Sequence, residues 1–274
     1  MKIIVAIKQV PETSKVKMDP ETGTMIRAGL EAIINPLDLY AIETALRLKE
    51  SYGAQVTVIT MGPQKADKAL REAVAMGCDD ALLISGRQFG GADTWATSYT
   101  LAQAIRKLGP FDLILCGERA TDGDTGQVGP GLAAHLDLNL ATYVSKLSLM
   151  EENKLRVERL VEEGRQVLAI PCPALLTVIK EIASPRLPTL RGMKRAKALQ
   201  IPTWGADEID TDPGKIGLKG SPTRVVKITS PKVTRETELI TARSADELQT
   251  VKVRFRRFVD EIGIECGHSQ QGEV

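Results

Sequence analysis

Residues 117–130 hold the groups best suited to binding a small anionic molecule. This segment has four glycines in fourteen residues and also carries Asp122, Asp124, Thr125 and Gln127. Glycine lets backbone amides approach a phosphate closely and adopt dihedral angles that other residues avoid. The segment lacks both the Walker spacing and the Gly-x-Gly-x-x-Gly spacing, so its composition alone fits a structural turn and a phosphate cradle equally well.

The two aspartates constrain how this segment would bind a phosphate. Asp122 and Asp124 would repel a phosphate in direct contact. We therefore expect both carboxylates to accept hydrogen bonds from ribose hydroxyls or from backbone amides. The groups expected to face the phosphates are Thr125, Gln127 and the amides of Gly126 and Val128, with Gly123 leaving room beside the backbone.

Side chains for conventional catalysis are scarce. The two histidines, His135 and His268, lie apart from any nucleophile or metal-ligand cluster, and the four cysteines are widely scattered. The sequence has no paired-cysteine, Gly-x-Ser-x-Gly or His-Glu-x-x-His motif. We therefore predict no catalytic residue and no metal site, and any redox chemistry would be carried by a bound cofactor.

The elements that would position these groups follow a βαβ pattern up to about residue 140. The predicted strands are nearly all apolar, as strands covered on both faces must be, and span residues 3–7, 56–60, 81–84 and 113–116. The predicted connecting helices span about residues 36–52, 64–76 and 94–108. We infer an α/β fold with a parallel sheet, in which ligands bind beyond the carboxyl ends of the strands.

The start of the first helix is expected to form the opposite wall of that binding crevice. Asn35 suits the N-cap, Pro36 suits the first helical position, and Asp38 places negative charge in the first turn. Simple helix capping explains each of these residues singly at least as well as ligand binding does.

Other segments extend this domain or follow it. A hairpin inserted at residues 15–27, a second at 143–150 and 154–160, and a buried run at 174–179 are predicted. An amphipathic helix with capping-box spacing begins at Ser244, and its apolar face needs a partner surface. We predict a nucleotide-binding α/β domain at residues 1–190, followed by a C-terminal arm at residues 191–274 that ends in this helix and packs on another chain.

Composition argues against two classes of partner. The 36 basic and 35 acidic residues leave a formal charge of +1, which gives no global attraction to a phosphate backbone. Every apolar run is shorter than the roughly 20 residues of a membrane span, and the first run ends at Lys8. We expect a cytoplasmic protein with no nucleic-acid partner and no transmembrane segment.

Five stretches in order then carry a specific resemblance. They are residues 5–11, 35–38, 60–63, 122–130 and 157–177, and together they make the chain similar to the β subunit of electron transfer flavoproteins over essentially its full length. The resemblance implies an adenine nucleotide α-hydrolase-like, Rossmann-like domain and a heterodimer with an α subunit. The positions that match the family's nucleotide pocket are Ala6, Asn35, Pro36, Leu37, Asp38, Met61, Gly62, Asp122, Gly123, Asp124, Thr125, Gly126, Gln127 and Val128.

Family members differ in what this pocket holds. Ordinary members hold AMP there, whereas electron-bifurcating members hold a second FAD that accepts hydride from NADH. The Gly-Asp-Thr-Gly-Gln-Val-Gly-Pro run beginning at Gly123 resembles the bifurcating type, so FAD is expected, with AMP as the alternative. The implied electron acceptors are an acyl-CoA-type dehydrogenase and a low-potential carrier such as ferredoxin or flavodoxin. A stand-alone adenine-nucleotide sensor is the remaining alternative.

The family's partner-recognition loop matches residues 181–190. By this resemblance Ile182 is the apolar anchor, and Pro185, Arg186 and Leu187 complete the recognition segment. Composition alone would describe the same residues as an ordinary loop punctuated by proline.

Overall fold

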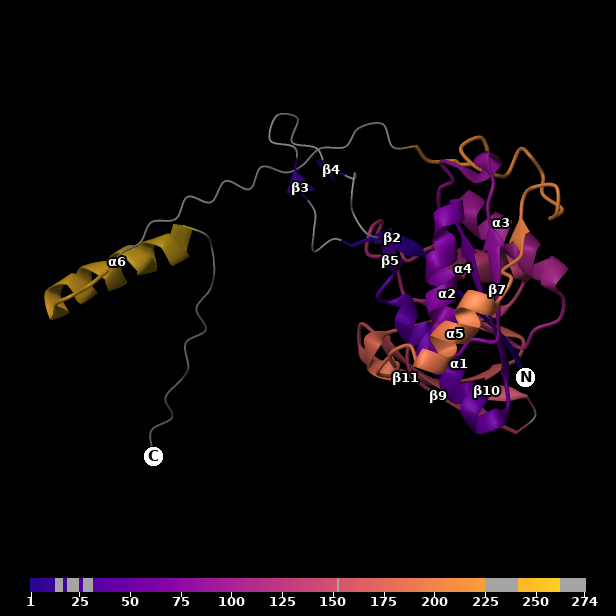
Figure 1. Ribbon diagram of the computed structural model, residues 1–274. Coiled ribbons are helices and arrows are strands. Elements are labelled where there is room, and N and C mark those ends of the chain that lie inside the picture. Colours follow the sequence, from indigo (N-terminus) through magenta and orange to yellow (C-terminus); the bar gives the residue numbers. More distant parts are fainter. Residues whose placement is uncertain (13–16, 19–24, 27–31, 152, 225–240, 262–274) are drawn as a thin grey trace. The chain divides into compact units, whose positions relative to one another are not determined.

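The structure is a computed structural model that describes residues 1–12, 17–18, 25–26, 32–151, 153–224 and 241–261 (Figure 1). The chain divides into two compact units, Met1–Ile228 and Thr229–Val274.

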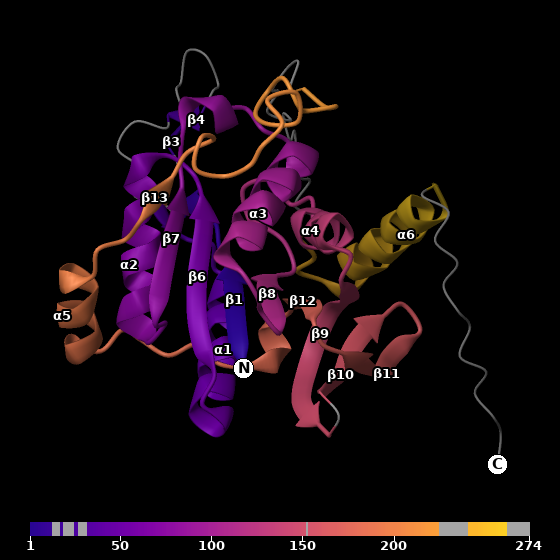
Figure 2. The ribbon, with the colours of Figure 1, turned by 90° about the vertical axis from the view of Figure 1, so that its right-hand side faces the viewer.

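The first unit is built on a nine-stranded sheet (Figure 2). From one edge to the other, its strands are β11 (Gly164–Pro171), β10 (Lys154–Val161), β9 (Asn139–Met150), β12 (Ala174–Val178), β8 (Leu113–Gly117), β1 (Lys2–Ala6), β6 (Gln55–Met61), β7 (Asp80–Ile84) and β13 (Thr203–Trp204). Neighbouring strands from β9 to β13 are parallel, and β10 is antiparallel to both of its neighbours. The expected parallel α/β sheet is therefore confirmed.

Helices cover both faces of this sheet, because alternate residues of each central strand point to opposite sides. One apolar layer joins Ile3 and Val5 of β1 to α1 (Asp38–Tyr52) and α2 (Asp67–Met76). The other joins Ile4 and Ala6 to α3 (Thr94–Leu108) and α4 (Val128–Leu136). Short 3-10 turns complete the connections: η2 (Gln64–Ala66), η3 (Arg87–Phe89) and η4 (Lys180–Ile182).

Most of the predicted helix ends are confirmed. Gly53 ends α1 in the left-handed region with a φ of 66°, and the Asp93 carboxylate caps α3 by accepting a hydrogen bond from the Ala96 amide at 3.0 Å. The expectation that Asn35 caps α1 is wrong. The N-cap residue is Leu37, without a side-chain cap, because the Asn35 carboxamide bonds elsewhere.

The predicted hairpins are found in part. β3 (Lys17–Met18) pairs with β4 (Met25–Ile26), and β2 (Gln9–Pro11) pairs with β5 (Ala32–Ile34), while the rest of the predicted insertion lies outside the described residues. β9 and β10 form the second predicted hairpin. β11 was not predicted and adds an outer edge strand, because the chain turns back at Glu162 and Glu163 so that Gly164 pairs with Val161.

Residues just beyond 190 pack on the first unit. The helix α5 (Leu190–Ala198) lies on α2, β13 pairs with β7, and Ile209 and Ile216 are buried in the α3 layer. The boundary expected at residue 190 therefore falls inside this unit. The sequence did not reveal the packing of α5, because this helix is mostly polar and Ala196 is its one buried residue.

The second unit contains the helix α6 (Ala245–Glu261). Half of the predicted capping box forms, with the Glu247 amide donating to the Ser244 hydroxyl at 3.2 Å, whereas the Glu247 carboxylate accepts from the Arg243 amide at 2.6 Å. Large apolar side chains on α6 are exposed, including Phe255 and Phe258. That α6 packs on another chain stays a prediction.

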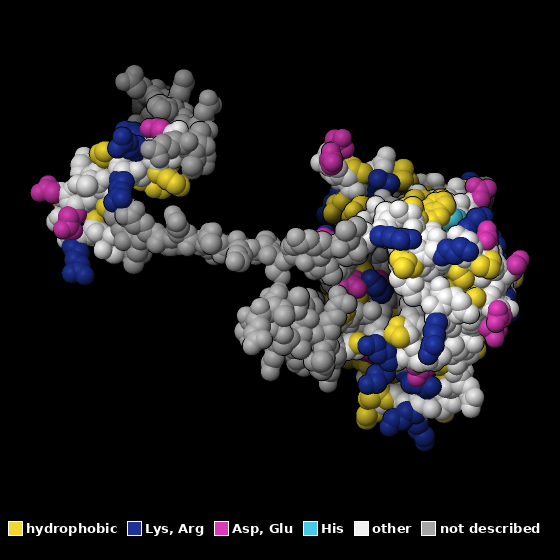
Figure 3. Space-filling view, turned by 90° about the horizontal axis from the view of Figure 1, so that it is seen from above, with side chains coloured by type: hydrophobic (Ala, Val, Ile, Leu, Met, Phe, Trp, Pro, Cys, Tyr) yellow, Lys and Arg dark blue, Asp and Glu magenta, His cyan; other side chains and the backbone are white. Residues whose placement is uncertain are grey.

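The surface agrees with the balanced composition. In Figure 3, both basic and acidic side chains are spread over the visible face of the first unit. Among the described residues, no helix is both long enough and apolar enough to cross a bilayer.

Gly192 allows α5 to approach α2 closely, which generates the first prediction. A β-carbon built on Gly192 would collide with the Ala75 carbonyl oxygen of α2. We expect Gly192→Ala to weaken the docking of α5 by about 1–3 kcal/mol, as overpacking does, and to speed hydrogen exchange of the α5 amides. Gly123→Ala is the matched control, since its β-carbon would have no neighbour within 4 Å. Unchanged exchange in α5 would contradict this packing.

Candidate functional site

The candidate site lies where the sheet changes its direction of winding. The chain passes from β1 through α1 to β6 on one side, and from β8 through α4 to β9 on the other. β1 and β8 are nevertheless neighbours, so the loops that leave their carboxyl ends diverge and open a crevice between them.

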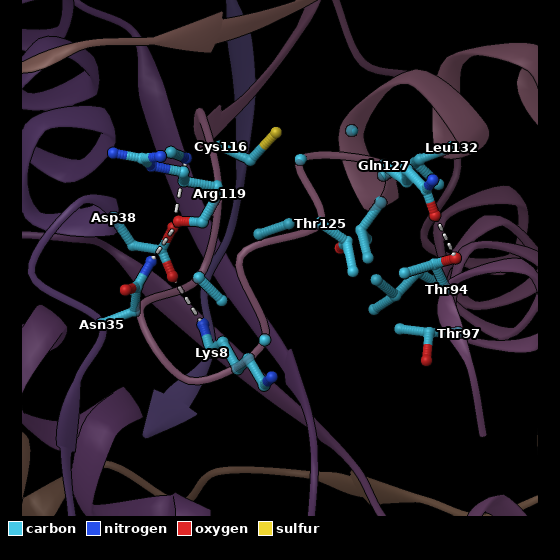
Figure 4. A pocket seen from close by; sticks show the side chains of 18 of the residues that line it. Lys8, Asn35, Asp38, Thr94, Thr97, Cys116, Arg119, Thr125, Gln127 and Leu132 are labelled. Atoms are coloured by element: carbon cyan, nitrogen blue, oxygen red, sulfur yellow. Dashed lines mark hydrogen bonds between the residues drawn. The ribbon is translucent and has the colours of Figure 1, made fainter. Parts of the chain in front are cut away.

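A pocket of about 610 Å³ occupies this crevice (Figure 4). Its lining comes from the ends of β1, β6 and β8, the starts of α1, α3 and α4, and the loop before α4. Figure 4 shows Lys8, Asn35, Asp38 and Arg119 on one side, with Thr94, Thr97 and Gln127 on the other. The pocket is therefore bounded by two separate sets of polar groups.

Asp38 joins the two strands that flank the crevice. Its carboxylate accepts a hydrogen bond from the Lys8 amide, just after β1, at 2.7 Å, and one from the Gly117 amide, at the end of β8, at 3.1 Å. Burial raises the pKa of Asp38 to about 7, although hydrogen bonds from Lys8, Asn35 and Gly117 act to lower it. The predicted first-turn acid is thus a buried cross-brace between two strands.

Asn35 fixes the pocket loop to the same corner. Its side chain is fully buried, donates to the Arg119 carbonyl at 2.9 Å and accepts from the Thr121 amide at 3.1 Å. Because both polar atoms of the carboxamide bond to the loop backbone, Asn35 holds residues 119–121 against the start of α1.

The two aspartates of the loop form ion pairs. Asp122 accepts from the Lys8 ammonium at 2.6 Å, and the Asp124 carboxylate lies 3.2 Å from the Arg119 guanidinium. These cations offset the carboxylates and so reduce their repulsion of an anion in the pocket. Contacts of either aspartate with ribose stay a prediction.

The start of α4 offers anion-binding amides. Gln127 is the N-cap residue, but its side chain makes no cap hydrogen bond, and Val128 and Gly129 line the pocket. The first amides of a helix have no intrahelical acceptor, and the helix dipole adds partial positive charge there. The start of α4 therefore suits a phosphate group.

The start of α3 provides the second set of polar groups. Thr94 donates from its hydroxyl to the Gln127 side-chain oxygen at 2.9 Å, and Thr97 lines the pocket one turn later. The cap residue Asp93 also accepts hydrogen bonds from the Thr223 amide and hydroxyl. Burial alone would raise the pKa of Asp93, but bonds from Ala96 and Thr223 lower it below its usual value.

The floor of the pocket is apolar and offers no nucleophile. Cys116 and Leu132 line it, and burial raises the pKa of the Cys116 thiol, which keeps it neutral. His135 lies on α4 outside the lining, with its ring centroid 4.6 Å from that of Trp95. In the part of the chain that the structure describes, no group of three His, Cys, Asp or Glu side chains is placed to hold a metal ion.

The structure brings most of the predicted pocket residues together. Those that line the pocket are Ala6, Asn35, Asp38, Met61, Gly123, Thr125, Gly126, Gln127 and Val128. Those outside the lining are Pro36, Leu37, Gly62, Asp122 and Asp124. Whether any of these residues binds a cofactor stays a prediction.

Sequence reasoning missed polar residues on both sides of the pocket. Lys8, Thr94, Thr97, Arg119 and Thr223 line it but were not predicted as site residues. The position of Thr94 at a helix start after a strand was a usable signal, since helix starts gather at the carboxyl edge. Nothing in the sequence pattern pointed to Thr223, which follows a polar, weakly patterned stretch.

The predicted recognition segment is anchored by charge. Arg186 donates to Glu43 on α1, with a 2.8 Å bond from its Nε, and also bonds to Glu50. The Glu43 side chain is only 4% exposed, yet the hydrogen bonds and charge of Arg186 outweigh burial and lower the pKa of Glu43. Leu187 is 85% exposed, whereas Ile182 is half-buried and packs on the core. The exposed apolar groups of this segment are therefore Leu187 and Leu190, which is 84% exposed.

Comparisons with known proteins agree with this architecture. Residues 22–209 match the family model described as the electron transfer flavoprotein domain. The chain is 46% identical over 258 residues to the electron transfer flavoprotein subunit beta of Thermoanaerobacterium thermosaccharolyticum, covering 93% of this chain and 98% of that protein.

Two further relatives carry other names. The chain is 45% identical over 249 residues to the caffeyl-CoA reductase-Etf complex subunit CarD of Acetobacterium woodii, covering 90% and 95% of the two chains. It is 45% identical over 257 residues to protein FixA of Azotobacter vinelandii, covering 90% of each chain. The chain belongs to the electron transfer flavoprotein family as a β subunit, and the proteins of that family transfer electrons.

The raised pKa of Asp38 predicts a pH-dependent stability. Because its folded-state pKa of about 7 exceeds the ordinary value of 3.8, the folded chain binds more protons between these values. The free energy of unfolding should therefore fall as pH rises from 4 to 7, by up to about 1.4 kcal/mol per pH unit. The Asp38→Asn variant should lack this fall in the free energy of unfolding between pH 4 and 7. Denaturant titrations of both proteins across that range test it, and parallel pH profiles would contradict it.

The ion pairs of Arg186 generate a third prediction. Arg186→Gln leaves the buried Glu43 carboxylate with Arg47, which bonds to it at 3.0 Å, as its remaining cation. We expect a loss of about 1–3 kcal/mol in the free energy of unfolding. The control Glu50→Gln removes only an exposed pair and should stay within about 1 kcal/mol of wild type. Equal losses in the two variants would show that Glu43 does not depend on Arg186.

Proposed function

We propose that the pocket binds FAD and that this chain, with an α subunit, takes electrons from NADH and divides them between two acceptors. The observation that carries this proposal is the start of α4, which has no side-chain cap and lines a pocket at the sheet's switch point. This is the arrangement that binds phosphate groups of dinucleotide cofactors in open α/β sheets.

The residues of the pocket fit such a cofactor. The amides of Val128 and Gly129 and the hydroxyls of Thr97 and Thr125 would hold its phosphates. Lys8 and Arg119 supply positive charge close by. When bound, a flavin supplies the redox chemistry that the side chains of this pocket do not.

Donor placement supports FAD over AMP. The volume of about 610 Å³ lies within the usual range of small-molecule and cofactor pockets. Hydroxyls on α3 and amides on α4 supply two donor sets, which suits two linked phosphates better than one. The glycines at 123 and 126 leave backbone room for the second phosphate.

Relatives support the proposed partners. The name of one relative places it in a complex with a caffeyl-CoA reductase, and others are named as β subunits. We propose an α subunit as the obligate partner, an acyl-CoA-type dehydrogenase as one acceptor and ferredoxin or flavodoxin as the other. Segment 181–190 would dock the dehydrogenase, with Leu187 as the exposed apolar contact in place of Ile182.

Cofactor counting tests this proposal. We expect the complex of the full chain with its α subunit to release two flavins per heterodimer and no AMP. One flavin with one AMP would instead make the chain a β subunit of the non-bifurcating type. A stable, colourless homodimer that responds to ATP would favour an adenine-nucleotide sensor and overturn the electron-transfer proposal for this pocket.

The hydroxyl of Thr97 provides the fourth prediction. Thr97→Val keeps the side-chain shape but removes a donor from the pocket, so the dissociation constant for FAD should rise about tenfold to a hundredfold. Thr57→Val, at a half-buried threonine of β6 outside this pocket, is the matched control. Flavin titration of the apo-complex measures both, and an unchanged constant for Thr97→Val would remove α3 from the binding site.

A further inference from the structure

Tyr143 has an unusual backbone conformation close to the pocket loop. It lies within the strand β9, yet its φ is +57°, in the left-handed region. Bulky residues rarely adopt this conformation, and such strain persists only where neighbouring groups hold it in place. The position of Tyr143 therefore needs a physical cause and a reason for being retained.

A β-bulge is the cause. Ala141 pairs with Leu176 of β12 and Val144 pairs with Val178, so two residues of β9 face the single residue Thr177. The Tyr143 amide donates to the Thr177 hydroxyl at 3.1 Å, and Thr177 is 2% exposed. The bulge turns Tyr143 out of the regular alternation of the strand.

The bulge brings the Tyr143 hydroxyl beside the pocket loop. A β-carbon built on Gly126 would lie 3.9 Å from this hydroxyl oxygen and 3.4 Å from the Glu118 carbonyl oxygen. Gly126 itself has a φ of +63° and lines the pocket, whereas Tyr143 lies outside the lining. The phenol and the Glu118 carbonyl thus border a turn whose backbone forms part of the pocket.

Core packing does not account for this arrangement. Tyr143 is 44% exposed, so its ring contributes little to the buried layers. A strained aromatic residue that is half in solvent costs stability without an equal gain in burial. What the strained conformation does achieve is to place the Tyr143 hydroxyl beside the turn at Gly126.

We infer that Tyr143 is a positioning residue, which holds the turn at Gly126 where the amides before α4 can face a bound phosphate. This inference rests on the proposed nucleotide pocket. The strained conformation of Tyr143 then supports the shape of the binding site, although Tyr143 itself touches no ligand.

The test separates positioning from a purely structural role. Asparagine tolerates a positive φ, so Tyr143→Asn relieves the strain while removing the ring. In the complex with the α subunit, we expect Tyr143→Asn to keep or raise the thermal midpoint while the dissociation constants for FAD and AMP rise about tenfold. Tyr143→Phe removes only the hydroxyl that lies beside Gly126, so it should raise both dissociation constants in the same direction but by less.

Asp137→Asn is the matched control. Asp137 ends α4 with a φ of +53°, so this variant eases a similar conformation at the opposite end of the helix from the pocket. It should leave binding unchanged.

Binding by Tyr143→Asn equal to that of wild type would overturn the inference and leave the proposed function standing. A parallel loss of binding and thermal midpoint would assign Tyr143 a structural role and also overturn it. If the wild-type complex binds neither FAD nor AMP, the proposed function fails first and the inference fails with it.

Discussion

The site depends on one buried carboxylate. The Asp38 carboxylate accepts hydrogen bonds from backbone amides at the ends of β1 and β8. The loops that follow these two strands must separate for a pocket to exist. The ion pair of Lys8 with Asp122 also links these two loops, but it is exposed to solvent, whereas the Asp38 bridge is buried. The bridge has a cost, because full burial raises the pKa of the carboxylate to about 7. Burying this acid costs free energy, but its hydrogen bonds fix the geometry of the crevice.

The surrounding polar contacts extend this bridge into a loop of defined shape. Asn35 holds the loop backbone at Arg119 and Thr121, while Lys8 and Arg119 pair with Asp122 and Asp124. An acidic loop next to a phosphate would be unfavourable if its carboxylates were free. The ion pairs with Lys8 and Arg119 reduce the repulsion between these aspartates and an anion. The backbone amides at the start of α4 stay available to bind that anion.

The helix α1 links this pocket to the segment that is predicted to recognise a partner. Asp38 stands in its first turn at the pocket, and Glu43, just over one turn later, binds Arg186 of the recognition segment. Both acids are almost fully buried and both are satisfied by groups far away in sequence. The same rigid helix therefore sets the position of the pocket wall and of the exposed Leu187.

Local patterns in the chain were enough to predict the central strands, three helices and the glycine-rich loop. The reason is that strands such as β8 are apolar throughout, and helices such as α3 carry their own capping residues, so these signals need no distant partner. Partners remote in sequence decided the rest. Asn35 follows the rules for a cap but bonds instead to a loop 84 residues away, and the positive φ of Tyr143 arises only when β9 meets β12. Thr223 reaches Asp93 across 130 residues, and only folding creates that proximity.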